Sequence, residues 1–136
     1  MLDDRRMSRV TETDPVARAR AEVAAGAALD KSGTDVVILE VGEILGIIEL
    51  FVLASASNVR QVKTIVEEVE RAVAEADGGK PRSIEGLADA SWVLMDYGDV
   101  VVHVFLDEIR AFYDLDRLWS DVPRTEVDVP AAQPAT

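Results

Sequence analysis

The stretch SWVLMDYGDVVVHVF, residues 91–105, decides how the chain folds. Two apolar, β-branched runs flank a Gly-containing turn, which is the pattern of an antiparallel hairpin. With the turn centred on Tyr97-Gly98, side-chain alternation predicts three cross-strand pairs on one face, which only a β-bulge would break. These pairs are Trp92 with His103, Leu94 with Val101, and Asp96 with Asp99. The opposite, aliphatic face is expected to pack under helices and consists of Val93, Met95, Val100, Val102 and Val104.

The segments before the hairpin predict one helix followed by two strands. Asp14 at the N-cap and Pro15 at the first helical position begin an Ala-rich helix over 15–31. Two β-branched runs, at 35–41 and 49–56, are typical of buried strands. The residues between these runs, VGEILGII, can form turns or extend the second strand.

A second helix, strongly amphipathic, is predicted over 58–76. Valine and isoleucine recur there at helical spacing and form one apolar stripe. Ser57 or Asn58 can cap its start, and Gly78-Gly79 ends it. An extended connection over 81–90 then leads into the hairpin.

A last helix is expected over 107–119, with a break near Asp114. The order of elements predicts a single α/β domain over 14–120, with a mixed β-sheet and helices packed on it. Residues 1–13 are polar and lack periodicity, so we interpret them as a flexible leader. Residues 121–136 contain three of the five prolines and are predicted to be a disordered tail.

Composition excludes several classes of function. The formal net charge of −12 disfavours direct nucleic-acid binding and favours a basic protein partner, although acidity that only keeps the protein soluble explains it equally well. The absence of cysteine removes disulfides and thiolate chemistry and predicts the cytosol. No apolar run reaches the roughly 18 residues that a membrane span needs, and the first residues do not resemble a secretory signal.

The hairpin's polar residues do not predict a metal or catalytic site. Asp96 and Asp99 could supply oxygens, but His103 lies about 13 Å along the strand from Asp99, at about 3.3 Å per residue. Aspartates beside a turn more often bond the turn's own amides. His103 is the only histidine, and no serine near it stands in a recognisable nucleophile motif. We therefore expect no catalytic residue, no metal and no cofactor.

Macromolecular recognition is the remaining interpretation. Trp92 is the costliest side chain on its face to leave in water, and aromatic residues are enriched at interface hot spots. Leu94 enlarges the apolar patch, and the two aspartates could be anionic contacts at its end. The alternative, that a helix of this same chain covers Trp92, stays open at this stage.

The hairpin and the segment after it strongly resemble the ribosomal silencing factor family, also called the Iojap-related family, over about residues 15–120. This chain departs from the family pattern at two places: it has Glu49-Leu50 where members usually carry Asp-Tyr, and Ala56 where glycine is common. The motifs that carry the resemblance are Trp92 to Phe105, Arg110 to Trp119, Glu85-Gly86, Phe51 to Ser55 and Arg60 to Val62.

This resemblance implies a nucleotidyltransferase-like topology without enzymatic activity. It implies a translational repressor that binds the large ribosomal subunit through its fourteenth ribosomal protein, blocks joining of the small subunit when nutrients fail, and forms homodimers. A nucleotidyltransferase-like enzyme and a ribosome-assembly factor that uses the same contact are the alternatives. The partner-binding residues expected on this basis are Trp92, Leu94, Asp96, Tyr97, Gly98, Asp99 and His103.

Overall fold

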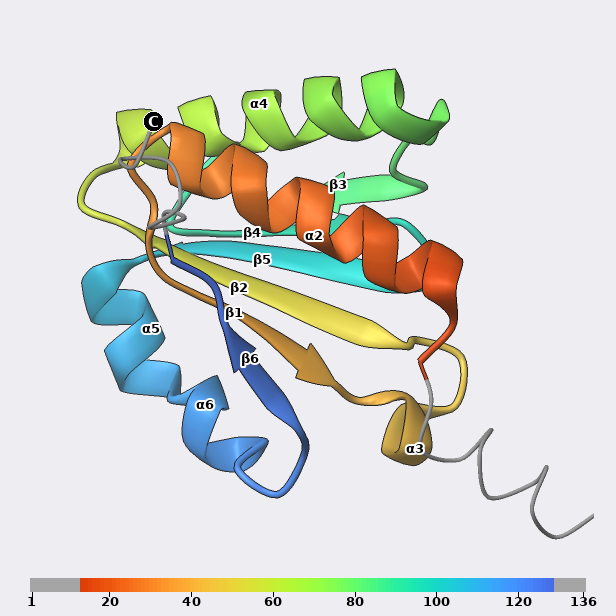
Figure 1. The fold of residues 1–136 in the computed structure, drawn as a ribbon. Helices are drawn as coiled ribbons and strands as arrows, with labels where there is room; N and C mark the ends of the chain where they lie inside the picture. Colours follow the sequence, from red (N-terminus) through yellow and green to blue (C-terminus); the bar gives the residue numbers. More distant parts are fainter. Residues whose placement is uncertain (1–12, 129–136) are drawn as a thin grey trace, which may run out of the picture.

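A computed structural model describes residues 13–128 as one mixed six-stranded sheet with helices on both faces (Figure 1). The strand order is β3-β4-β5-β2-β1-β6; β2 and β5 run parallel, and every other neighbouring pair is antiparallel. This confirms the predicted α/β fold. The elements are α2 (Pro15–Asp30), β1 (Thr34–Glu40), α3 (Gly42–Leu45), β2 (Leu50–Ala56), α4 (Val59–Asp77), β3 (Ser83–Glu85), β4 (Trp92–Asp96), β5 (Val100–Leu106), α5 (Asp107–Tyr113), α6 (Leu115–Leu118) and β6 (Arg124–Glu126).

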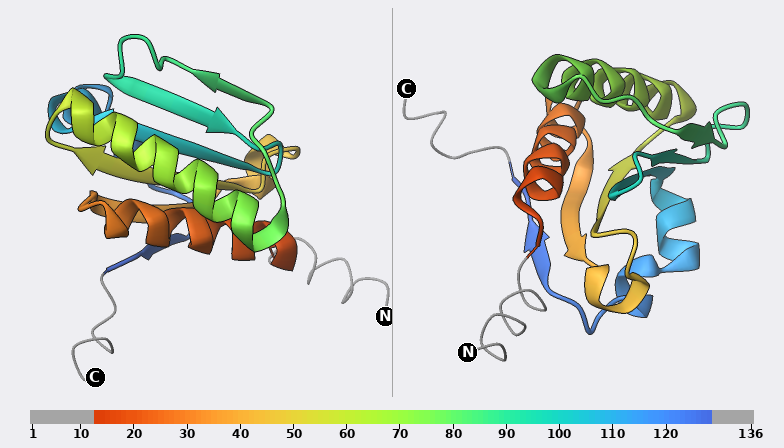
Figure 2. Two further views of the ribbon diagram at one scale, coloured as in Figure 1. Left: turned by 90° about the horizontal axis from the view of Figure 1, so that it is seen from above. Right: turned by 90° about the vertical axis from the view of Figure 1, so that its right-hand side faces the viewer.

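Helices α2 and α4 lie side by side on one face of the sheet (Figures 1 and 2). Asp14 caps α2 by accepting from the Val16 amide, and Asn58 caps α4 by accepting from the Gln61 amide. The apolar stripe of α4 is buried as its spacing predicts, except at Val59, the first helical residue, which is 39% exposed. Alanines on the buried side of α2 let that helix approach the sheet and α4 closely. The buried residues of the α4 stripe are Val62, Ile65, Val66, Val69 and Val73.

The predicted pairing of the hairpin is wrong by two residues. The turn is centred on Gly98-Asp99, where Gly98 has a φ of 95° and the Tyr97 amide donates to the Val100 carbonyl at 2.9 Å. A positive φ at the first loop residue is a conformation that glycine adopts without strain, so the glycine belongs at that position. Because a shift of two residues preserves the alternation, the two predicted faces of the strands are correct. The observed pairs are Trp92 with Phe105, Leu94 with His103, and Asp96 with Val101.

Both edges of the sheet differ from prediction. Strand β3 forms within the predicted extended connection, and β6 pairs with β1, so the predicted disordered tail is wrong for 121–128. Each edge strand has only three residues and little burial, so neither carries an alternating apolar pattern. The leader at 1–12 and the rest of the predicted tail lie outside the described residues.

Helices α5 and α6 lie on the face opposite α2 and α4 (Figure 2). The break predicted at Asp114 is present, since this residue separates the two helices with a φ of 51°. The core on this side is smaller than the core under α2 and α4, and it is richer in aromatic side chains. Within residues 13–128, no helix is both long enough and apolar enough to cross a lipid bilayer.

Candidate functional site: an apolar groove on the sheet

Two adjacent rows of side chains cross the sheet on the α5 side and enclose a hollow of about 200 Å³, the groove. Paired residues on neighbouring strands point to the same face, so the register decides which side chains share a row. The first row is Glu85, Leu94 and His103, and the second is Ser83, Asp96, Val101 and Phe51. Ile48, which precedes β2, completes the lining.

Trp92 packs beside the groove and is partly covered by the chain's own helix. Its ring centroid lies 5.4 Å from that of Phe105 and 5.0 Å from that of Tyr113 on α5. The side chain is half-buried. Each of the two alternatives for Trp92, an open recognition surface and cover by a helix of the same chain, therefore describes part of the side chain. Helix α5 covers one side of the indole, and the rest remains accessible.

His103 belongs to the floor of the groove, where its side chain is only 4% exposed. The indole Nε1 of Trp92 donates to His103 Nδ1 at 3.2 Å, and the Phe51 ring meets the imidazole edge-on at 4.6 Å. Burial lowers the pKa of His103 to about 4, so the ring is neutral at physiological pH. Since an indole nitrogen can only donate, Nδ1 is the acceptor and Nε2 carries the proton. His103 Nε2 is buried and has no hydrogen-bond partner among the described residues.

Large apolar side chains are exposed at the margins of the groove. Ile47, next to Ile48, is 80% exposed, and Tyr113, against Trp92, is 54% exposed. On the other side, Trp119 meets Phe51 at 5.5 Å and follows α6, which exposes Leu118. Large apolar side chains exposed around a hollow are a common feature of interaction sites on soluble proteins.

Only part of the predicted partner-binding set lies at the groove. Trp92, Leu94 and Asp96 do, and the Asp96 carboxylate also accepts from the Gly98 amide at 2.7 Å, which holds the turn. His103 lies beneath them with almost no exposed surface, so only an inserted group can reach it.

Tyr97 and Asp99 lie toward the helical layer instead, as a consequence of the two-residue shift in the turn. The Tyr97 side chain is buried with the core under α2 and α4, and burial raises its pKa to about 12. Asp99 forms an ion pair at 3.0 Å with Arg20 of α2, whose guanidinium also stacks over the Tyr97 ring. Neither side chain can therefore be a groove contact.

Sequence reasoning missed the groove residues outside the hairpin. Alternation along 49–56 indicates that Phe51 and Leu53 share a face, but the parallel pairing of β2 with β5 has no local signal. Glu85 and Ser83 come from β3, which the sequence pattern does not predict.

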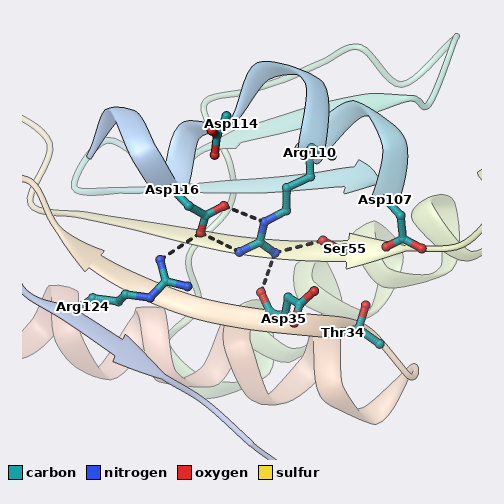
Figure 3. A pocket seen from close by; sticks show the side chains of 9 residues that line it. Thr34, Asp35, Ser55, Asp107, Arg110, Asp114, Asp116 and Arg124 are labelled. Carbon is teal, nitrogen blue, oxygen red and sulfur yellow. Dashed lines mark hydrogen bonds and ion pairs between the residues drawn. The ribbon is translucent and has the colours of Figure 1, made fainter. Parts of the chain in front are cut away.

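A second hollow, of about 520 Å³, lies at the carboxyl ends of β2 and β5 (Figure 3). Arg110 reaches into it from α5 and makes four hydrogen bonds: two to the Asp116 carboxylate, one to the Ser55 hydroxyl at 2.9 Å and one to the Asp35 carbonyl. Arg124 also binds Asp116, at 2.9 Å. The hydrogen bond from Arg110 is the largest cause that lowers the pKa of Asp116 to about 2. We call this group the Arg110 clamp.

The Arg110 clamp joins elements and has no group set up for reaction. Each of its charged groups has an oppositely charged partner, and its hydrogen bonds tie α5 and α6 to β1 and β2. Among residues 13–128, no three His, Asp or Glu side chains converge closely enough to hold a metal ion.

Comparison with known proteins identifies relatives of known family. Residues 14–136 match the model of a family described as "Ribosomal silencing factor during starvation". A ribosomal silencing factor of Halalkalibacterium halodurans is 38% identical over 107 residues, which cover 79% of this chain and 91% of that protein. The chloroplastic protein Iojap of Zea mays is 32% identical over 106 residues, covering 78% of this chain and 45% of the maize protein.

Solved structures of two bacterial proteins share the fold of this chain. A crystal structure of a Chromobacterium violaceum protein aligns with a TM-score of 0.72 at 32% identity, covering 88% of this chain and 98% of the other. A crystal structure from Bacillus halodurans aligns with a TM-score of 0.66 at 37% identity, covering 78% of this chain and 95% of the other.

Proposed function

The chain belongs to the ribosomal silencing factor family, and on this basis we propose that it binds the large ribosomal subunit and blocks joining of the small subunit. The contact that we propose is with the subunit's fourteenth ribosomal protein. The observation that carries the proposal is the groove, an apolar hollow beside a half-buried tryptophan and bordered by exposed Ile47 and Tyr113. An aromatic anchor next to an apolar pocket is the usual centre of a protein interface.

Blocking by this route requires occupied space and no chemical step. A bound factor of 14.8 kDa on the joining face would keep the small subunit away for as long as it stays bound. The net charge of −12 supports the choice of a basic ribosomal protein, because opposite charge speeds encounter at low salt. The proposal places this action in the cytosol. The homodimer implied by the resemblance stays a prediction.

The clamp does not support the enzymatic alternative. A nucleotidyltransferase needs carboxylates free to hold metal-bound triphosphate. Of the carboxylates that line the second hollow, Asp116 is already bound by Arg110 and Arg124. The others, Asp35, Asp107 and Asp114, belong to no cluster within residues 13–128 that could hold a metal ion. We therefore propose that the protein turns over no nucleotide, which is tested by incubating it with Mg²⁺ and nucleoside triphosphates.

Co-sedimentation with purified ribosomal subunits tests the proposed contact. We expect recovery with large subunits and not with small ones. Leu94→Glu places a charge on the apolar wall of the groove and should remove binding. Leu87→Glu makes the same change at an exposed leucine outside the groove and should bind as the unmodified chain does. Equal recovery with both subunits, or equal loss in both variants, would contradict the proposal.

A further inference from the structure

The groove contains a hydrogen-bond donor without an acceptor. Two buried side-chain polar atoms among the described residues have no partner, the Tyr97 hydroxyl and His103 Nε2. Of these two residues, His103 lines the groove, whereas Tyr97 lines neither of the two hollows described above. Native structures satisfy most buried polar groups, and a buried donor at a binding site is satisfied when its ligand arrives.

The chain holds this donor in one orientation and one protonation state. Trp92 Nε1 occupies Nδ1 of the imidazole, and Phe51 packs edge-on against the ring. Both contacts prevent the ring from turning over. Burial keeps the ring neutral, so Nε2 presents a single N–H and no charge. Such a group needs an oxygen acceptor, and the carboxylates of Glu85 and Asp96 in the same lining disfavour an anion, so a neutral carbonyl fits it better.

The rest of the lining indicates what accompanies that acceptor. The floor and walls are mainly apolar, from Leu94, Phe51 and Val101, and about 200 Å³ is smaller than typical small-ligand pockets of about 300–1,000 Å³. The rim toward β3 and β4 is acidic, from Glu85 and Asp96, and neither has an ion-pair partner within residues 13–128. A hollow of this size with a charged rim suits one apolar side chain with a cation beside it.

We propose that the groove receives an apolar side chain of a basic segment of the ribosomal protein, and that His103 Nε2–H donates a hydrogen bond to a carbonyl oxygen of that segment. This inference rests on the proposed function and adds to it the chemistry of the partner. Trp92 acts here as a positioning residue, because its indole N–H fixes which imidazole nitrogen carries the proton.

Two variants of His103 test the hydrogen bond. His103→Phe keeps a flat apolar ring in the floor and removes the donor, so we expect about tenfold weaker binding to purified large subunits. Its thermal unfolding temperature should change little, because the substitution removes the unpaired Nε2–H but also removes the Nδ1 acceptor of the half-buried Trp92 indole. His103→Gln keeps an N–H near the position of Nε2 and should bind more tightly than His103→Phe. A purely structural histidine would instead lower stability and leave the affinity of the folded protein unchanged.

Nuclear magnetic resonance of the ¹⁵N-labelled full chain reports the proton directly. In the free protein we expect the single histidine to be neutral with its proton on Nε2. On addition of the purified fourteenth ribosomal protein, the Nε2–H signal should move downfield and exchange more slowly with water. A proton on Nδ1, or an Nε2–H signal that does not respond although binding occurs, would overturn the inference.

The outcomes separate this inference from the proposed function. If His103→Phe binds large subunits as the unmodified chain does while Leu94→Glu does not, the hydrogen bond is wrong and the proposed function stands. If the unmodified chain binds neither the large subunit nor the ribosomal protein, both are wrong. The inference would also be overturned if a nucleotide or RNA bound in the groove, remained bound in the Leu94→Glu variant and was not displaced by the ribosomal protein.

Discussion

The two hollows described above differ in whether their polar groups have hydrogen-bond partners within the chain. The larger, at the Arg110 clamp, has its central groups satisfied internally: Arg110 and Asp116 neutralise each other and bridge three segments (Figure 3). The smaller, the groove, is mainly apolar and contains one buried N–H with no acceptor. If the proposed function is correct, the larger hollow is structural and the smaller one is the binding site. The unmet hydrogen bond and the exposed apolar margin distinguish a binding site from a structural one.

The largest expected effect comes from breaking the clamp. Arg110→Leu leaves the Ser55 hydroxyl and the Asp35 carbonyl without this partner and the Asp116 carboxylate with Arg124 alone, and should lower the free energy of unfolding by about 3 kcal/mol. Urea unfolding measures the loss. Arg71→Leu is the control, because its ion pairs on α4 are exposed and should contribute less than about 1 kcal/mol. A loss below about 1 kcal/mol for Arg110→Leu would mean that the clamp does not hold the fold together.

The second-largest expected effect is the pH dependence of stability, which differs between His103 in the groove and Asp116 in the clamp. The pKa of His103 is lowered from 6.5 to about 4, so the unfolded chain takes up a proton in this range while the folded chain does not. Above about pH 6.5 the histidine has no effect; as pH falls toward 4 the free energy of unfolding should decrease, by up to about 3 kcal/mol.

The clamp responds at lower pH. The pKa of Asp116 is lowered from 3.8 to about 2, so its stabilisation is present above about pH 4 and is lost as pH falls toward 2.

Urea unfolding between pH 7 and pH 4 tests the histidine. The free energy of unfolding should decline less over this range for His103→Phe than for the unmodified chain. Parallel curves for the two proteins would show that the histidine is not buried and neutral in the fold.

Trp92→Ala should have a medium effect on both stability and binding. Because Tyr113 and Phe105 cover one side of the indole, truncation should cost about 2 kcal/mol of folding stability, less than for a fully buried tryptophan. As an interface anchor its loss should weaken binding about thirtyfold.

Val102→Ala is the matched control on the opposite face of the same hairpin. It should lower stability by about 2 kcal/mol and leave the affinity of the folded fraction unchanged. A Trp92→Ala protein that is destabilised but binds as tightly as before would assign the tryptophan to the core alone.

The smallest expected effect is at the rim of the groove. Glu85 is exposed, and Glu85→Gln removes one negative charge without removing an ion pair seen within the described residues. We expect about twofold weaker binding at low salt and a shallower dependence of affinity on salt concentration. Glu67→Gln, at an exposed position of α4 and likewise without an ion pair within the described residues, is the control. If the affinity of both variants depends equally on salt concentration, the charge of Glu85 does not contribute to binding at the groove.

Sequence reasoning predicted the features that depend on local period. The stripe of α4 and the two faces of the hairpin follow from side-chain repeats of 3.6 and 2 residues, and the faces tolerate a register error of two. The turn itself was misplaced because Tyr97-Gly98 and Gly98-Asp99 are both plausible turn pairs. The observed turn places Gly98 at the first loop position with a positive φ, and Asp99 forms an ion pair with Arg20.

Features that depend on distant contacts were not predictable from the sequence. Arg110 lies 75 residues from Asp35 and 55 from Ser55, so nothing local indicates a clamp. The groove needs β2 beside β5, a parallel pairing across a whole helix. The orphaned proton on His103 follows only once Trp92 is known to occupy the other nitrogen.

The central claim is that an occupied groove keeps the ribosomal subunits apart, and a subunit-joining assay tests it most directly. Purified large and small subunits are mixed with the protein and resolved on a sucrose gradient. We expect the unmodified chain and Leu87→Glu to reduce the joined ribosome peak, while Leu94→Glu leaves it at the level seen without protein. Full inhibition by Leu94→Glu, with the folded state confirmed by circular dichroism, would contradict the account and move the silencing surface away from the groove.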